Sequence, residues 1–183
     1  MIKDFDLLQR ANNDYTTIDL EHAEELAYRE LIDSIRYIPL GDECGVMGNI
    51  ANIITYKGRF YIQEEQFDRV FIYDDTGRCL KKIDNKGRGP GEYLRIESID
   101  INTEKEELML VDGMSDKLFF YDLDGNFKSI HSIRYFQTEN TLCLRDSVFL
   151  HISAPSQNFG NEGLYGYALV LSKGNENFLK GYR

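Results

Sequence analysis

From residue 49 onward, the apolar and polar positions of the chain follow the pattern of short β-strands and show no helical period. Turns rich in glycine and aspartate separate the apolar runs. The first four runs predict strands over residues 50–56, 59–63, 69–73 and 78–83. A glycine-rich loop over residues 84–91 follows, and then the pattern starts again.

This four-strand pattern is an internal repeat. Residues 73–77 match residues 121–125 at an offset of 48, and residues 68–71 fall without a gap on residues 116–119. A weaker third unit follows, with apolar runs at residues 142–144, 148–152, 167–171 and 178–179. Four antiparallel strands that recur every 45 to 50 residues are typical of β-propeller blades. A β-sandwich also has short alternating strands, but it does not predict this ungapped match between consecutive units.

We therefore predict an all-β fold. It is a partial β-propeller with about three four-stranded antiparallel blades, at about residues 49–84, 95–133 and 140–183. These blades make up a domain of residues 41–183.

The N-terminal residues 1–40 have a different pattern. Asp19 is a suitable helix N-cap, and apolar residues then recur at steps of three and four positions, which predicts one short helix that ends near Ser34. Residues 35–40 alternate and predict a strand. Because Pro39 cannot donate a backbone hydrogen bond, we expect this strand at a sheet edge.

Composition and charge exclude several classes of partner. With 42% hydrophobic residues in a chain of 183, we expect a folded core. The net charge of −10 argues against nucleic acid and against an anionic membrane surface, since both need a basic face. No run of 18 apolar residues predicts membrane insertion, and the first residues lack the apolar core of a signal peptide.

The cysteines and histidines do not form a recognisable chemical motif. The three cysteines are odd in number, lie far apart and contain no Cys-x-x-Cys pair, so we interpret them as small apolar residues and not as disulfides or metal ligands: Cys44, Cys79 and Cys143. The three histidines show no metal-ligand spacing: His22, His131 and His151. We expect no metal, no cofactor and no catalytic residue.

The glycine-rich loop supplies the first candidate site. Residues 87–93 read Gly-Arg-Gly-Pro-Gly-Glu-Tyr, but no Lys-Ser/Thr follows, so this is not a phosphate-binding loop. We interpret it as the connection between two blades, with Tyr93 packed between them. The functional alternative is that Arg88, Glu92 and Arg95 contact a ligand at the face of the ring.

Recurring carboxylates supply the second candidate. Asp112 and Asp116 flank the turn between two strands, and Glu64 and Asp68 lie at the matching places one repeat earlier. They could bind a cation, but bonds to the local backbone are the commoner role of such residues. We also expect local ion pairs between Asp68 and Arg69 and between Asp116 and Lys117. The candidate ligand-binding residues are therefore Arg88, Glu92, Tyr93, Arg95, Asp112 and Asp116.

On these residues the chain resembles a known family. The matching positions are Gly87, Gly89, Pro90, Gly91, Glu92 and Tyr93, residues 99–101, 110–112 and 120–122, Gly125, and the segment 31–40. They resemble the NHL repeat and, more closely, the six-bladed β-propeller proteins of Bacteroides-type gut bacteria. The chain looks like the N-terminal half of such a protein, so we expect a fragment with two bare blade faces and a tendency to self-associate. The resemblance also implies that the strand at residues 36–40 would complete a last blade that is missing from this chain. The resemblance also implies a periplasmic or cell-surface location.

The leading functional hypothesis is a non-catalytic binding module of the bacterial cell envelope, whose ligand is a glycan, a peptide or another protein. This rests on analogy of fold. The alternative is a fragment of a propeller lyase or hydrolase with its active site in the channel of the complete ring. A third hypothesis is a fragment with no function of its own.

Overall fold

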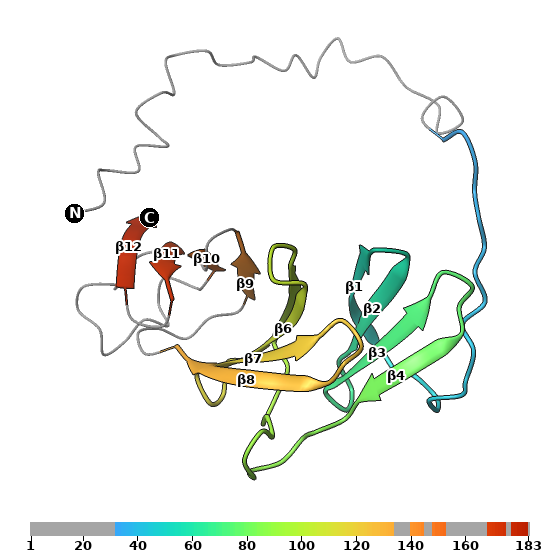
Figure 1. Ribbon diagram of the computed structural model, residues 1–183, viewed down its shortest axis with the longest axis horizontal. Coiled ribbons are helices and arrows are strands. Elements are labelled where there is room, and N and C mark those ends of the chain that lie inside the picture. Colours follow the sequence, from blue (N-terminus) through green and yellow to red (C-terminus); the bar gives the residue numbers. More distant parts are fainter. Residues whose placement is uncertain (1–31, 134–139, 145–147, 153–167, 175–176, 183) are drawn as a thin grey trace. The chain divides into compact units, whose positions relative to one another are not determined.

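The computed structural model of the chain describes residues 32–133, 140–144, 148–152, 168–174 and 177–182 (Figure 1). The chain divides into two compact units, residues Met1–Tyr37 and Ile38–Arg183. Within the described residues, all twelve strands lie in the second unit.

The second unit contains three separate four-stranded antiparallel sheets, each built from consecutive strands of the chain (Figure 1). In the first sheet the strands are β1 (Ile50–Tyr56), β2 (Arg59–Glu64), β3 (Arg69–Asp74) and β4 (Cys79–Ile83). In the second they are β5 (Ser98–Asn102), β6 (Glu107–Asp112), β7 (Lys117–Asp122) and β8 (Phe127–Ser132). In the third they are β9 (Asn140–Cys143), β10 (Val148–Ile152), β11 (Leu169–Lys173) and β12 (Asn177–Tyr182). The predicted all-β class and the three four-stranded units are confirmed.

The helix and the strand predicted within residues 1–40 are not seen in the described residues. The helix predicted between Asp19 and Ser34 lies almost wholly outside the described residues, and residues 32–34 are not helical. The strand predicted over residues 35–40 is wrong, because these residues form no strand in the structure. Alternation alone does not make a strand, since its backbone needs a neighbouring strand to pair with.

The last turn of each of the first two sheets is built in the same way. The carboxylate of Asp74 accepts hydrogen bonds from the backbone N–H groups two and four residues later, and Asp122 does the same in the second sheet. Each turn contains a glycine with positive φ, Gly77 at 88° and Gly125 at 78°. This is a region that glycine enters at little cost.

Every sheet has two faces, which we call front and back. In the first two sheets the equivalent residues, 48 positions apart, lie on equivalent faces. The front face carries Tyr61, Val70 and Ile72 in the first sheet and Met109, Leu118 and Phe120 in the second. The back face carries Ile62, Phe71 and Tyr73 in the first sheet and Leu110, Phe119 and Tyr121 in the second.

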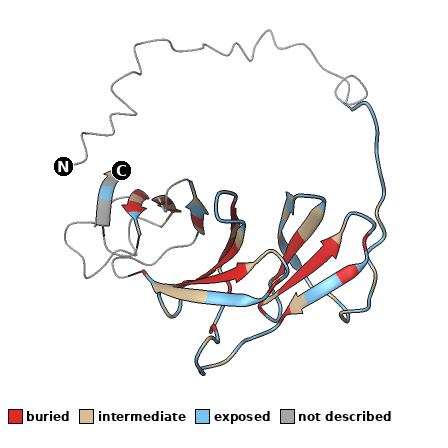
Figure 2. Ribbon diagram, in the orientation of Figure 1, coloured by how far each residue is buried: buried red, intermediate tan, exposed pale blue. Residues whose placement is uncertain are grey.

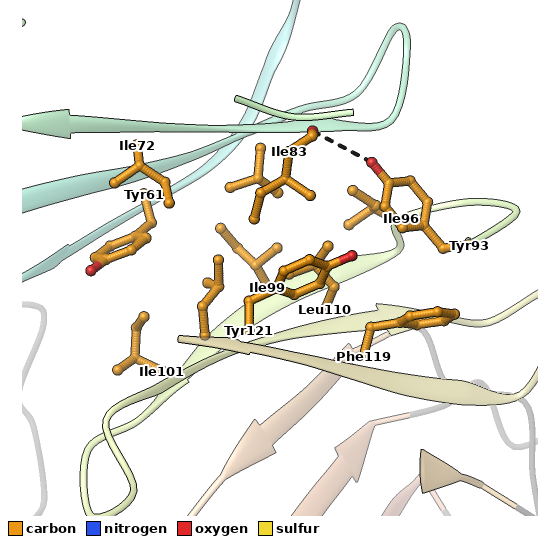
Figure 3. Packing of buried hydrophobic residues seen from close by; sticks show 12 residues of the cluster. Tyr61, Ile72, Ile83, Tyr93, Ile96, Ile99, Ile101, Leu110, Phe119 and Tyr121 are labelled. Atoms are coloured by element: carbon orange, nitrogen blue, oxygen red, sulfur yellow. Dashed lines mark hydrogen bonds between the residues drawn. The ribbon is translucent and has the colours of Figure 1, made fainter. Parts of the chain in front are cut away.

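The sheets pack front to back. The front of the first sheet and the back of the second form one buried cluster, which includes Tyr61, Ile72, Phe119 and Tyr121 (Figure 3). The front of the second sheet packs in the same way on the third sheet, through Phe149 and other residues. We call this side of the third sheet its back. Figure 2 shows the burial concentrated on the middle strands of the first two sheets.

The back of the first sheet is covered by a segment of residues 38–47, which we call the strap. The backbone N–H of Gly41 donates to the carbonyl oxygen of Gly77 (2.8 Å), and the hydroxyl of Tyr73 donates to the carbonyl oxygen of Gly41 (3.2 Å). Cys44 and Met47 pack on the apolar residues of this face. The strap therefore covers the back of the first sheet, whereas the back of the second sheet is covered by the front of the first sheet.

A disulfide between Cys44 and Cys79 ties the strap to β4, with a Cα–Cα distance of 5.9 Å. Our interpretation of the cysteines as unbonded apolar residues is therefore wrong for these two. The bond joins residues 35 positions apart, and the fold of the strap over the sheet brings them together. Cys143 is a free, half-buried thiol.

Candidate functional site

Three segments meet at one end of the first two sheets and form what we call the loop face. They are the β2–β3 turn (residues 64–69), the β4–β5 loop (residues 84–97) and the β6–β7 turn (residues 112–117). Asp68 joins the first two segments, because its carboxylate accepts from Ile96 N (3.1 Å) and pairs with Lys86. Asp112 joins the last two, because its Oδ2 accepts from Leu94 N (2.7 Å). All six predicted ligand-binding residues lie on these segments.

Glu92 holds the β4–β5 loop in shape. Its Oε2 accepts a hydrogen bond from the backbone N–H of Gly89 (2.7 Å). A short backbone pairing closes the loop, with Gly87 N donating to Tyr93 O at 2.9 Å. Gly91 has a φ of 83°, which any residue with a side chain adopts at a cost. The glycines and Glu92 therefore serve the local geometry of this loop.

Tyr93 is fully buried between the first two sheets, as the sequence predicted (Figure 3). Its ring meets Phe119 edge to face at 6.0 Å, and its hydroxyl donates to the carbonyl oxygen of Asp68 (2.8 Å). Burial raises the pKa of the Tyr93 hydroxyl, so it stays protonated. Tyr93 anchors the loop in the core and does not lie on the exposed surface.

Asp112 is a buried turn-capping carboxylate. Its Oδ1 accepts from the backbone N–H groups of Met114 (3.0 Å) and Ser115 (3.1 Å), and its Oδ2 accepts from the Ser115 hydroxyl (2.6 Å). These bonds agree with the local-backbone role and occupy both oxygens. Asp116 is exposed and has a positive φ of 53°. Partial burial of the carboxyl group, together with the nearby charge of Asp112, raises the pKa of Asp116.

The predicted Asp68–Arg69 ion pair is wrong. Arg69 pairs with Glu64, whose Oε2 lies 2.9 Å from Arg69 Nε. The Arg69 guanidinium also lies over the ring of Phe67, 4.5 Å from its centroid. Asp68 faces Lys86 instead, because its positive φ of 56° turns it toward the β4–β5 loop.

The exposed side chains of the loop face include two that the sequence analysis missed. Phe67 is 51% exposed and lies on the β2–β3 turn, and Met114 is 64% exposed and lies on the β6–β7 turn. Arg88 and Arg95 are also exposed, and Arg95 pairs with Glu97 at 3.2 Å. The signal that could have found Phe67 and Met114 is a large apolar residue inside an otherwise polar turn.

His151 lies in a second polar group, on the back of the third sheet. Its Nδ1 is 2.9 Å from the Thr141 hydroxyl, and its Nε2 is 2.8 Å from the Ser172 hydroxyl. Burial lowers the pKa of His151 to about 4, so the ring is neutral at pH 7. In the described part of the chain, no group of three or more His, Cys, Asp or Glu side chains is placed to hold a metal ion.

A family model described as a domain of unknown function, DUF4934, matches residues 15–182. The chain belongs to the DUF4934 family. No curated protein matches this DUF4934 chain in sequence. Within the described residues, no helix is long and apolar enough to cross a membrane.

Two solved structures that are similar to this DUF4934 chain come from Bacteroides species. One is from Bacteroides fragilis and is named as a candidate exported protein. It has 20% sequence identity to this chain and a TM-score of 0.71, and the match covers 81% of this chain and 42% of the Bacteroides fragilis chain. Another, a DUF4221 family member from Bacteroides vulgatus, has 10% identity and a TM-score of 0.47, covering 74% of this chain and 44% of its own. The DUF4934 chain spans less than half the length of either structure.

The family assignment corrects our expectation. The chain is not identified as an NHL-type six-bladed propeller, because the matching family is DUF4934 and the described residues form three separate sheets with no closed ring. The motif that carried the resemblance explains the error. Gly87, Gly89 and Glu92 shape one loop and Tyr93 fills the core beneath it, and these roles are local.

Proposed function

We propose that this DUF4934 chain is a non-catalytic binding module of the bacterial cell envelope, and that its loop face binds a peptide or an extended segment of another protein. The observation that carries the proposal is the exposure of Phe67 and Met114 on two turns that are both joined to the β4–β5 loop. Aromatic residues and methionine are enriched in protein interfaces, and a thioether adapts to varied partners.

The frame beneath these side chains supports the proposal. Asp68 and Asp112 bind both turns to the β4–β5 loop, and Tyr93 anchors that loop between two sheets. A recognition surface on a rigid frame loses little entropy on binding. The exposed Arg88 adds a donor of the kind that often contributes strongly to interfaces.

The arrangement of the sheets fits blades of a partial β-propeller, and we include this arrangement in the proposal. Two observations support it. The sheets pack front to back in chain order, and β5 contacts both β1 and β9, so the first strands of the three sheets are neighbours. In a propeller the first strands lie around a common axis.

The envelope location has its own support. Disulfides form and persist in oxidising compartments, and Cys44 and Cys79 are joined by one. The similar Bacteroides fragilis protein is named as a candidate exported protein. Both observations support a location outside the cytoplasm, which we include in the proposal.

A selection experiment tests the binding role. The purified chain is used to select from a displayed random-peptide library, and in parallel it is applied to a glycan array. We expect selected peptides whose affinity falls at least about tenfold in the Phe67→Ala/Met114→Ala variant, a loss of about 1.4 kcal/mol. Leu80→Ala is the matched control, because Leu80 is an exposed leucine of the first sheet outside the loop face.

Three results would contradict the proposal. One is that no peptide is selected. Another is that the selected peptides bind the double variant and the Leu80→Ala control equally well. The third is binding to glycans alone, which would replace the peptide by a sugar ligand.

A further inference from the structure

The loop face carries more acidic than basic side chains. Its three segments contain eight Asp or Glu residues and five Lys or Arg residues. Four of these carboxylates are balanced by ion pairs: Glu64 with Arg69, Asp68 with Lys86, Glu97 with Arg95, and Asp84 with Lys82. Four carboxylates and two bases of the loop face have no ion pair among the described residues: Glu65, Glu92, Asp112 and Asp116, and Arg88 and Lys117.

Two of these carboxylates lie close in sequence to the exposed apolar side chains. Glu65 is exposed two residues before Phe67 on the β2–β3 turn, and Asp116 is exposed two residues after Met114 on the β6–β7 turn. Partial burial raises the pKa of Asp116, and the negative charge of Asp112 raises it further. Each turn therefore presents an apolar side chain together with a negative charge that no cation of the described residues balances.

We propose that the peptide bound by the loop face is basic, so that its lysine or arginine side chains contact Glu65 and Asp116 while its apolar residues contact Phe67 and Met114. This inference rests on the proposed function and adds the chemistry of the partner. Complementary charges on facing surfaces select the partner and speed the encounter. The net charge of the chain, −10, acts in the same direction over a longer range.

The ring of Phe67 also suits a basic partner. The guanidinium of Arg69 already lies 4.5 Å from the centroid of this ring, and Glu64 balances its charge. The face of an aromatic ring attracts cations, and 51% of Phe67 remains exposed for a lysine or arginine of the peptide. The exposed Arg88 does not oppose such a partner, because its guanidinium can donate to backbone carbonyl groups, which every peptide offers.

Three displayed peptide libraries of equal size test the inference. All three carry Phe or Leu at the same fixed positions. The remaining positions are restricted to Lys and Arg in the first library, to Asp and Glu in the second, and to Ser and Asn in the third. Selection uses the unmodified chain with its disulfide intact, in about 0.1 M salt, where charges interact over about 10 Å. We expect the tightest binders to come from the Lys/Arg library.

Neutralising the two exposed carboxylates tests where the charge acts. The affinity for the tightest basic peptide should fall about threefold to tenfold in Glu65→Gln/Asp116→Asn at about 0.1 M salt, and by less at about 0.5 M salt. Asparagine suits the positive φ of 53° at Asp116.

The matched control is Asp42→Asn/Asp75→Asn, which removes the same charge from two exposed residues. Asp75 follows the far end of β3, a strand of six residues and about 20 Å, and the strap residue next to Asp42 is bonded to the same turn. Because this distance exceeds the screening length, the control should change the affinity less than about twofold.

The outcomes separate this inference from the proposed function. If the tightest binders come from the Asp/Glu or Ser/Asn library and Phe67→Ala/Met114→Ala still weakens them, the basic partner is wrong and the peptide site remains. If no library yields a binder, both are contradicted. If Glu65→Gln/Asp116→Asn and the control lose equal affinity, the net charge of the chain attracts the basic peptides, and the inference is overturned. Far-UV circular dichroism checks that each variant is folded, and Glu65→Gln alone replaces the double variant if that does not fold.

Discussion

Replacing Gly125 by alanine tests the contact between the first two sheets. Gly125 has a φ of 78° and lies in the β7–β8 turn, where it is buried against the first sheet. An added Cβ would lie 2.9 Å from both Ile72 Cδ1 and Lys81 Cγ. Real Cβ atoms do not approach other atoms so closely, so the side chains of Ile72 and Lys81 in the first sheet would have to shift.

Two costs follow from this geometry. A positive φ costs an alanine about 1–2 kcal/mol compared with glycine. Crowding a packed interface by one methyl group costs about another 1–3 kcal/mol. Gly58→Ala separates the two, because Gly58 has a similar φ of 70° and its added Cβ would meet nothing within 4 Å. We expect Gly125→Ala to lower the free energy of unfolding by about 1–3 kcal/mol more than Gly58→Ala does.

Equilibrium unfolding in urea, followed by far-UV circular dichroism, measures both variants. Circular dichroism is the suitable probe because the chain has no tryptophan. The disulfide is kept oxidised in all samples so that the unfolded state is the same. Equal losses in the two variants would refute the inference that Gly125 is a contact point between the sheets. A larger loss in Gly58→Ala would refute it as well.

Three further predictions concern the disulfide, His151 and Asp112. Denatured without reductant, the chain should react with one equivalent of a thiol reagent, and three reactive thiols would show that the bond does not form. The Cys44→Ser/Cys79→Ser variant should lose about 4 kcal/mol of unfolding free energy, which is the loop-closure value for the 35-residue separation. The pKa of His151 is about 4 in the folded chain and near 6.5 in the unfolded chain, so between pH 4 and 6.5 only the unfolded chain protonates this imidazole. The free energy of unfolding should therefore fall by up to about 3 kcal/mol as the pH drops from 6.5 to 4. His151→Asn should flatten that part of the pH profile, and an unchanged slope in urea titrations would contradict the assignment. In the same assay, Asp112→Ala should lower the free energy of unfolding by about 2–3 kcal/mol, because it leaves the amides of its turn without an acceptor. Asp112→Asn should lower it by less, and equal losses would argue against the capping role.

The loop face could be predicted in part. The repeat places the β2–β3 and β6–β7 turns at equivalent positions, and the motif at residues 87–93 marks the loop that lies beside them. The buried position of Tyr93 also followed from the sequence. The exposure of Phe67 and Met114 did not, because an apolar residue in a turn packs inward or outward according to what surrounds it.

The ion pairs of Asp68 and Arg69 also could not be predicted from the sequence. Asp68 and Arg69 are adjacent in sequence, but Asp68 lies in the turn before β3 with a φ of 56°, and its carboxylate pairs with Lys86. Arg69 pairs with Glu64 across the β2–β3 turn, since these residues are directly opposed in the ladder. Ladder register decides this pairing, and sequence distance does not.

By itself, the sequence determined the all-β class, the four-strand repeat and most strand limits, because alternation and turn residues act over a few neighbouring positions. Only the tertiary structure decided which face of each sheet meets which, that the strap covers the first sheet, and that Cys44 bonds to Cys79. These contacts join residues tens of positions apart. Their geometry depends on how whole sheets pack, and no local pattern in the chain records it.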